Sequence, residues 1–150
     1  MTAYVALLRG VNVGSHGRID MATLKRTFEQ LGCEDVRTYI NSGNVLFHDR
    51  RKPATLTRLA EKELGTRVAI RTLAQLDELC ASIPEHYADD REQKTDVAFL
   101  LDEPGERVFN ARRADLERGQ GIVEVDGPVT VRNVNTVRKL RALLAALERN

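Results

Sequence analysis

The sequence predicts an α+β fold, because two kinds of hydrophobic pattern alternate along it. Short apolar runs rich in Val, Ile and Phe have the character of strands, and longer segments repeat apolar residues every three or four positions as amphipathic helices do. Glycine, asparagine and proline mark the turns between them. With 150 residues, of which 42% are hydrophobic and 30% charged, the chain can bury a core without disulfides or metals.

The first part of the chain predicts a strand, a helix and a hairpin. Residues 4–9 form an apolar run, and a glycine-rich loop follows over residues 10–17. Asp20 is placed to cap a helix that Gly32 ends and whose apolar residues share one face, namely Met21, Leu24, Phe28 and Leu31. Two strands at 36–40 and 45–48 flank an Asn-Ser-Gly-Asn sequence that is typical of a tight turn.

The same signals continue to residue 84. Pro53 predicts the start of a second helix, whose inward residues are expected to be Leu56, Leu59, Ala60 and Leu64. Residues 67–71 alternate as a strand, and Thr72 and Gln75 form a capping box at the start of a third helix. Residues 3–71 therefore have the order βαββαβ, which is ferredoxin-like, and right-handed crossovers predict a sheet with strand order 4-1-3-2.

The rest of the chain predicts a second, incomplete unit with the order βαββα. We expect an acidic surface loop at 85–92, a strand at 97–101, a helix at 107–118, a hairpin made of 122–125 and 129–132, and a last helix that Asn135 caps. The whole chain, 1–150, is interpreted as a single domain with a ferredoxin-like part (1–72), a connecting helix and loop (73–93) and a βαββα part (94–150). The residues predicted to be most buried are Leu7, Leu24, Phe28, Leu59, Phe99, Leu140 and Leu144.

Composition excludes several classes of function. The net charge is +1, which argues against nonspecific nucleic-acid binding, although the first half of the chain is basic and the second acidic. No segment has the length and apolar character of a signal peptide or a membrane span, so we expect a soluble, cytoplasmic protein without a membrane partner. Cys33 and Cys80 are too few for a disulfide framework, His48 is expected at the surface, and no spacing indicates a metal or cofactor.

The predicted strand order brings two polar segments to one edge of the sheet. The loop 10–17 follows the first strand and the turn 41–44 precedes the third, and these strands are antiparallel neighbours. Glycine-rich loops and helix N-termini bind anions through backbone amides, and arginine binds phosphate or carboxylate. We therefore expect a small anionic or nucleotide-like ligand at this edge, bound by Arg9, Asn12, Ser15, His16, Asn41, Ser42 and Asn44. The alternative interpretation is that these residues only build the loop and the turn.

Other functions remain open at this point. An acid–base enzyme would use His16, but the chain has no nucleophile motif, which favours a protein without catalytic activity. RNA binding on the sheet would need exposed aromatic side chains on the central strands, and the sequence offers few of them. A self-associating regulatory module is the third possibility, and the sequence does not define an oligomeric state.

Three stretches of the chain resemble the bacterial domain-of-unknown-function family 1697. They are Tyr4-Val5-Ala6-Leu7-Leu8-Arg9-Gly10-Val11-Asn12-Val13-Gly14, Thr38-Tyr39-Ile40-Asn41-Ser42-Gly43-Asn44-Val45-Leu46-Phe47 and Arg132-Asn133-Val134-Asn135-Thr136-Val137-Arg138-Lys139-Leu140. Family members usually carry Trp where this chain has Val134. The resemblance implies an α+β fold with a ferredoxin-like first half and no established activity. Helix capping does not readily account for Asn133 in the third stretch, so we add Asn133 to the candidate ligand-binding residues.

Overall fold

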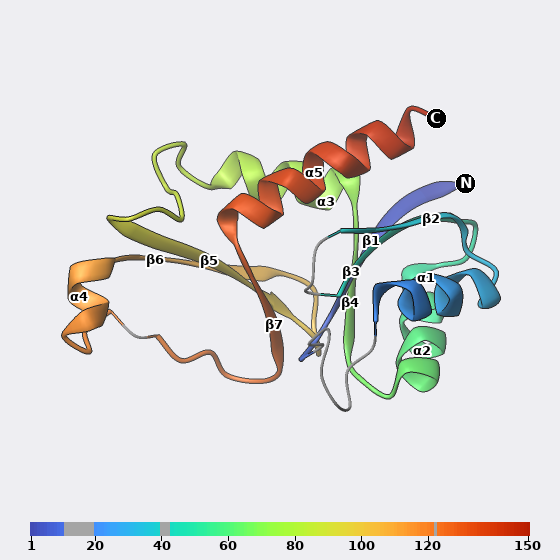
Figure 1. Ribbon diagram of the computed structural model, residues 1–150, viewed down its shortest axis with the longest axis horizontal. Coiled ribbons are helices and arrows are strands. Elements are labelled where there is room, and N and C mark those ends of the chain that lie inside the picture. The colour runs from blue at the N-terminus through green and yellow to red at the C-terminus, as the bar shows by residue number, and fades with distance from the viewer. Residues whose placement is uncertain (11–19, 40–42, 122) are drawn as a thin grey trace.

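The chain forms two antiparallel sheets with helices packed on their faces (Figure 1). The computed structural model describes residues 1–10, 20–39, 43–121 and 123–150. Within these ranges the first sheet has the order β2-β3-β1-β4 and the second the order β6-β5-β7. Mixed α+β character is therefore confirmed, and the order of the first sheet is the one predicted from the sequence.

Strand β1 (Thr2–Leu8) lies inside the first sheet because both of its edges are paired. It pairs antiparallel with β3 (Asn44–Asp49) on one side and with β4 (Val68–Thr72) on the other, and β2 (Glu34–Tyr39) pairs with β3. Residues 3–8 are all buried, as expected for a strand whose two faces are both covered.

One face of this sheet is covered by α1 (Met21–Gln30) and α2 (Pro53–Leu64), which lie together in Figure 1. Both helices begin and end as predicted: Asp20 Oδ1 accepts a hydrogen bond from Thr23 N at 2.7 Å, and Gly65 ends α2 in the left-handed region with φ 68°. The prediction for Leu59 was wrong, since this residue is only half-buried. The buried stripe of α2 instead passes through Leu56 and Ala60, which are one helical turn apart.

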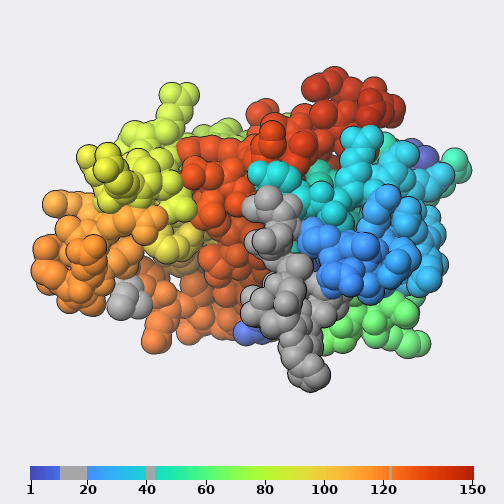
Figure 2. All heavy atoms as spheres, viewed as in Figure 1, coloured from blue at the N-terminus to red at the C-terminus, as the bar shows by residue number. Residues whose placement is uncertain are grey.

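The other face of the first sheet shares a core with the second sheet. Helices α3 (Leu73–Ser82) and α5 (Val134–Glu148) pack against it, and α3 begins with the predicted capping box of Thr72 and Gln75. This core combines Val5 and Leu7 of β1 with Val97 and Phe99 of the second sheet and with buried residues of the two helices, namely Leu76, Leu79, Val137, Leu140, Leu144 and Leu147. Figure 2 shows the orange and red atoms of the last part of the chain packed against the blue and cyan atoms of the first part.

The order of elements predicted for residues 94–150 was wrong. The structure has β5 (Gln93–Leu100), β6 (Glu106–Arg112), the short helix α4 (Arg113–Glu117) and then β7 (Val129–Asn133). The predicted helix at 107–118 is thus a strand up to residue 112, because β5 is a central strand and β6 supplies hydrogen bonds along its whole length. The predicted hairpin of 122–125 and 129–132 was also wrong. Residues 123–125 are not in a strand, residue 122 lies outside the described ranges, and β7 pairs with β5.

Two arginines of the β4 region connect the sheets by ion pairs. Arg71 Nε lies 3.1 Å from Glu106 Oε1, and Arg71 also donates to the carbonyl oxygens of Leu100 and Gly105 at the β5–β6 turn. Arg67 Nη2 lies 2.8 Å from Asp102 Oδ1 in the same turn. Because Arg71 is 7% exposed, its charge pair is largely shielded from water, so it helps to fix the orientation of the second sheet relative to the first.

Helix α1 is held to the end of β3 by a buried polar cluster. Asp49 is 4% exposed and accepts hydrogen bonds from Arg51 N, Nε and Nη2, while Arg51 Nη2 also donates to Leu31 O at 2.6 Å. These hydrogen bonds from Arg51 hold the pKa of the Asp49 carboxyl below its ordinary value. The expectation that His48 is a surface residue was wrong: it is buried, and its Nδ1 lies 2.8 Å from Asp35 Oδ2.

The same cluster predicts an unreactive thiol. Burial, reinforced by the Asp49 carboxylate, raises the pKa of Cys33 to about 12, so the nucleophilic thiolate is scarce at neutral pH. In a Cys80→Ser variant, we expect Cys33 of the native protein to react with iodoacetamide at least about 100-fold more slowly than in the urea-unfolded chain. Mass spectrometry of timed samples measures both rates, and equal rates would contradict the burial of this thiol.

Within the part of the chain that the structure describes, no helix is long and apolar enough to cross a membrane.

Candidate functional site

A buried arginine on β7 lies at the centre of the candidate site. Arg132 is 7% exposed, and its side chain projects from the second sheet toward the first. Its Nε donates to Asn44 Oδ1 at 2.7 Å, its Nη1 to Thr130 Oγ1 at 2.7 Å, and its Nη2 to Leu8 O at 2.9 Å. Burial removes water from the guanidinium and lowers the pKa of Arg132 to about 10. One side chain thus connects the last strand to the first and third.

Asn44 occupies the position where the tight turn of the sequence analysis leads into β3. Its side chain is completely buried, and both polar atoms of its amide group form hydrogen bonds: Nδ2 donates to Tyr39 O at 3.1 Å, and Oδ1 accepts from Arg132 Nε. The first bond connects β2 and β3 across their turn, and the second connects this turn to β7. Asn44 therefore has a structural role in the turn and also orients the guanidinium.

The ends of β1 and β3 meet at this place, as the strand order requires. Leu7 is paired with Asn44 in the ladder, and Leu8 N donates to Gly43 O at 3.0 Å. Gly43 has φ 71°, a left-handed conformation that glycine adopts without steric cost. Thr130 Oγ1 donates to Leu8 O at 3.1 Å, so this carbonyl oxygen accepts from two side chains of β7.

Arg9 follows this junction and is held by its backbone. Its N donates to Arg67 O at 3.0 Å, and its O accepts from Thr66 Oγ1 at 2.7 Å. The side chain is exposed, and at Gly10, which has φ 68°, no atom lies within 4 Å of the position that a Cβ would occupy. Arg9 thus combines a fixed backbone with a solvent-accessible guanidinium, which suits the recognition of an anion.

Asn133, a candidate ligand-binding residue of the sequence analysis, is the N-cap of α5 in the structure. Asn133 Oδ1 accepts from Thr136 N at 2.9 Å, so it caps α5, and the prediction that Asn135 is the cap was wrong. The helix starts two residues earlier because β7 runs into α5 without a connecting loop. Side chains alternate along a strand, so Asn133 and Arg132 project from opposite faces of the second sheet. Asn135 Nδ2 donates instead to Asp89 O at 3.1 Å.

The remaining candidates, Asn12, Ser15, His16, Asn41 and Ser42, lie outside the described residues. Of the described candidates, Arg9 and Asn44 belong to the junction, whereas the oxygen of Asn133 is used in capping. The sequence analysis overlooked Thr130 and Arg132 as partners of this junction. A signal for them was present in the sequence: Thr130 and Arg132 are two residues apart on a strand, so their hydroxyl and guanidinium lie on the same face of the sheet.

The N-terminus of α1 is already occupied by its own cap. Asp20 caps α1, and the hydrogen bonds from Thr23 lower the pKa of its carboxyl. A carboxylate at the cap repels a second anion there, so the N-terminus of α1 does not favour anion binding. Among the residues that the structure describes, no group of three or more His, Cys, Asp or Glu side chains is placed to hold a metal ion.

The fold and the junction define an α+β protein of two antiparallel sheets that a buried arginine joins. Residues 1–130 match the family described as "Protein of unknown function (DUF1697)", and the chain belongs to this family. The third stretch of the sequence analysis lies beyond this match. Val134 within it is fully buried as the first residue of α5.

A solved structure has the same fold. The conserved bacterial protein SP0830 from Streptococcus pneumoniae is similar with a TM-score of 0.77 and 21% sequence identity, over 95% of this chain and 98% of that chain. At this level of identity the likeness shows the fold alone. No curated protein matches the chain.

Proposed function

We propose that this protein binds a small anionic or nucleotide-like ligand at the edge where β1 ends and β3 begins. The observation that carries the proposal is the hydrogen bonding of Arg132 to both Leu8 and Asn44, at the base of the loop 10–17 and the turn 41–44. Two arginines belong to this end of the sheet: Arg132, whose guanidinium donates to Leu8 O, and Arg9, whose backbone follows the end of β1. Only the second of them is exposed to solvent.

The two arginines would have different tasks. The Arg132 guanidinium is surrounded by protein, where charges interact more strongly than in water, and it raises the electrostatic potential of the edge. Arg9 would make the direct contact, because a guanidinium presents parallel N–H groups that match phosphate or carboxylate oxygens. The glycines of the loop 10–17 would allow backbone amides to approach the anion closely.

The arrangement of elements supports a ferredoxin-like first half and a single domain. The order βαββαβ with the sheet β2-β3-β1-β4 is that of the ferredoxin-like fold. One core joins both sheets, which favours one folding unit. Base stacking on the first sheet is not part of our proposal, because Tyr4 and Phe47 are buried beneath α1 and α2.

Thermal shift assays test the proposed function. Nucleotides, sugar phosphates and dicarboxylates at millimolar concentration should include at least one compound that raises the Tm, because a ligand that binds only the native state stabilises it. In the Arg9→Ala variant we expect this ligand-induced shift to be lost, while the Tm without ligand stays nearly unchanged because the side chain is exposed.

Arg50→Ala is the matched control. Arg50 is also exposed, but it follows the end of β3 at the opposite end of the sheet, where Asp49 is paired with Thr2. This variant should keep the full shift. An absence of any shift in the wild type, or an equal loss in both variants, would contradict the proposed site.

A further inference from the structure

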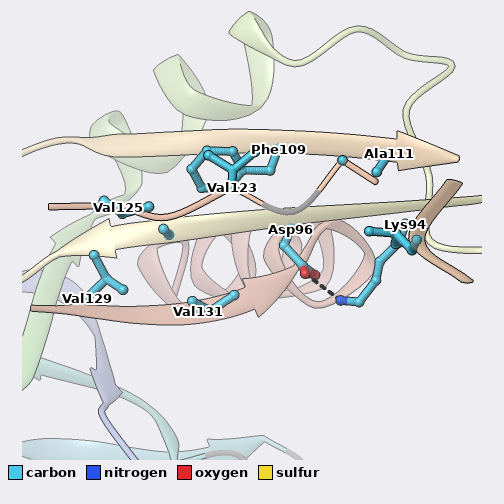
Figure 3. A pocket seen from close by; sticks show the side chains of 11 residues that line it. Lys94, Asp96, Phe109, Ala111, Val123, Val125, Val129 and Val131 are labelled. Carbon is cyan, nitrogen blue, oxygen red and sulfur yellow. Dashed lines mark hydrogen bonds and ion pairs between the residues drawn. The ribbon is translucent and has the colours of Figure 1, made fainter. Parts of the chain in front are cut away.

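The outer face of the second sheet carries an apolar groove that is separate from the proposed anion site. Alternation along β5 directs Val97 and Phe99 into the shared core, so Lys94, Asp96 and Ala98 project from the opposite face. Phe109 of β6 and Val131 of β7 flank them on this outer face (Figure 3). Val131 is 48% exposed, which is unusual for a valine in a paired strand and shows that this face is incompletely covered.

Gly121, Val123 and Val125, which lie between α4 and β7 in the sequence, form the far wall of the groove. Gly121 packs closely on β6, since a Cβ at this position would lie 3.2 Å from Ala111 Cβ. Val123 and Val125 follow and project over the sheet, as Figure 3 shows. The sheet and this wall border an open groove of about 340 Å³, a volume within the range of small-molecule sites.

The charged groups that line the groove cancel each other. Among the described residues that line it, Lys94 and Asp96 are the ionisable ones, and they form an ion pair with each other at one end. A ligand carboxylate placed there would be attracted by Lys94 but repelled by Asp96, and a ligand ammonium would meet the reverse. The pair therefore gives neither charge a net attraction that could offset its loss of water. A hydroxyl or amide group, in contrast, can accept a hydrogen bond from Lys94 or donate one to Asp96 without disturbing the pair.

We infer that this groove binds a small, uncharged, mainly apolar molecule that carries one hydroxyl or amide group. The apolar part lies against Phe109, Val125 and Val131, and the polar group lies at the Lys94–Asp96 pair. This ligand class differs from the anion proposed for the edge of the first sheet. Binding in the groove can therefore be tested independently of the proposed function.

The test uses the uncharged fluorescent probe N-phenyl-1-naphthylamine, with competitors that share one chain length. We expect the probe to bind with enhanced fluorescence, and 1-octanol to displace it at a concentration at least about fivefold lower than octanoate or octylamine. The reason is that a charged head loses water in the groove and the neutral ion pair gives it no net attraction. All competitors are used below their micelle-forming concentrations. A wild type that does not bind the probe, or that prefers either charged competitor, would overturn the inference.

Charge variants of the pair give a sharper signature. Asp96→Asn leaves Lys94 as the charged group and should change the preference toward octanoate, whereas Lys94→Met leaves Asp96 and should change it toward octylamine. Both side chains are partly exposed, so neither variant is expected to unfold the protein. Identical preferences in the wild type and both variants would show that the probe binds elsewhere and would overturn the inference.

Val131→Asp and Val123→Asp place a charge inside the groove and should each weaken probe binding at least about tenfold. Val123 is 55% exposed and lies in an irregular segment, so its variant reports on binding even if a charge on β7 affects folding. Ala22→Asp makes a similar change at an exposed residue of α1 and should bind the probe as the wild type does. Sedimentation that shows a dimer dispersed by Val131→Asp would assign the groove to a second copy of the chain and overturn the inference.

Discussion

Replacing Phe28 by alanine should lower the free energy of unfolding by about 3–5 kcal/mol, the usual cost of removing a buried aromatic ring. Phe28 is 1% exposed on α1, and its ring centroid lies 5.3 Å from that of Phe47 on β3. The ring therefore connects the first helix to the middle of the first sheet, and alanine would leave a cavity between two rigid elements. Urea denaturation followed by circular dichroism measures the change.

Two further variants make this test specific. Phe28→Leu keeps most of the apolar volume and should lose less than about half as much stability. Val123→Ala removes apolar atoms at a position that is 55% exposed and should change stability by no more than about 0.5 kcal/mol. A loss below about 1 kcal/mol for Phe28→Ala would mean that α1 is rotated away from the sheet.

Arg132→Met should lower the free energy of unfolding by about 3 kcal/mol, although methionine fills part of the space of the arginine. The variant leaves Asn44 Oδ1 without its donor and removes one of the two donors to Leu8 O, and each buried acceptor without a partner costs about 1–3 kcal/mol. Hydrogen exchange measures the local effect. Relative to the wild type, exchange in the variant should become faster for amides at the end of β1 and in β7 than for those of α2.

The conservative variant separates hydrogen bonding from charge. Arg132→Lys keeps the positive charge but cannot reach Asn44 and Leu8 at once with a planar fork, so it should lose nearly as much stability as Arg132→Met. Arg9→Ala serves as a control because its side chain is exposed. If Arg132→Met were as stable as the wild type, the hydrogen bonds of Arg132 would not hold the two sheets together.

The first half of the fold could be predicted because its signals are local. Asp20, Pro53, Gly65 and the pair Thr72–Gln75 mark helix ends by their own backbone chemistry, and the structure has them in these roles. The strand order then follows from the order of elements and the handedness of the connections. Leu59 was assigned to the core wrongly because a helix of this length has apolar residues at the margin of its buried stripe.

The second half could not be predicted because its signals are not local. The stretch that became β6 contains alanine and arginine, which also suit a helix, and only its pairing with β5 decides for a strand. The junction around Arg132 had the same difficulty. Its acceptors on Asn44 and Leu8 are 88 and 124 positions away in the sequence, so no local pattern connects the arginine to them.

The hydroxyl of Thr130 donates to Leu8 O, which lies 122 positions earlier in the chain. This separation in sequence determines which contacts can form first while the chain is being synthesised. A ribosome adds about 5–20 residues per second, so the end of β1 waits on the order of ten seconds before its partners on β7 exist. Until then the first sheet can pair its four strands, but its second face is covered only in part, by α3, because α5 comes last. Such late, long-range contacts make folding slow. We therefore expect a nascent chain that stops before β7 to leave Val5 and Leu7 on an incompletely covered sheet and to be a substrate for chaperones until β7 and α5 emerge.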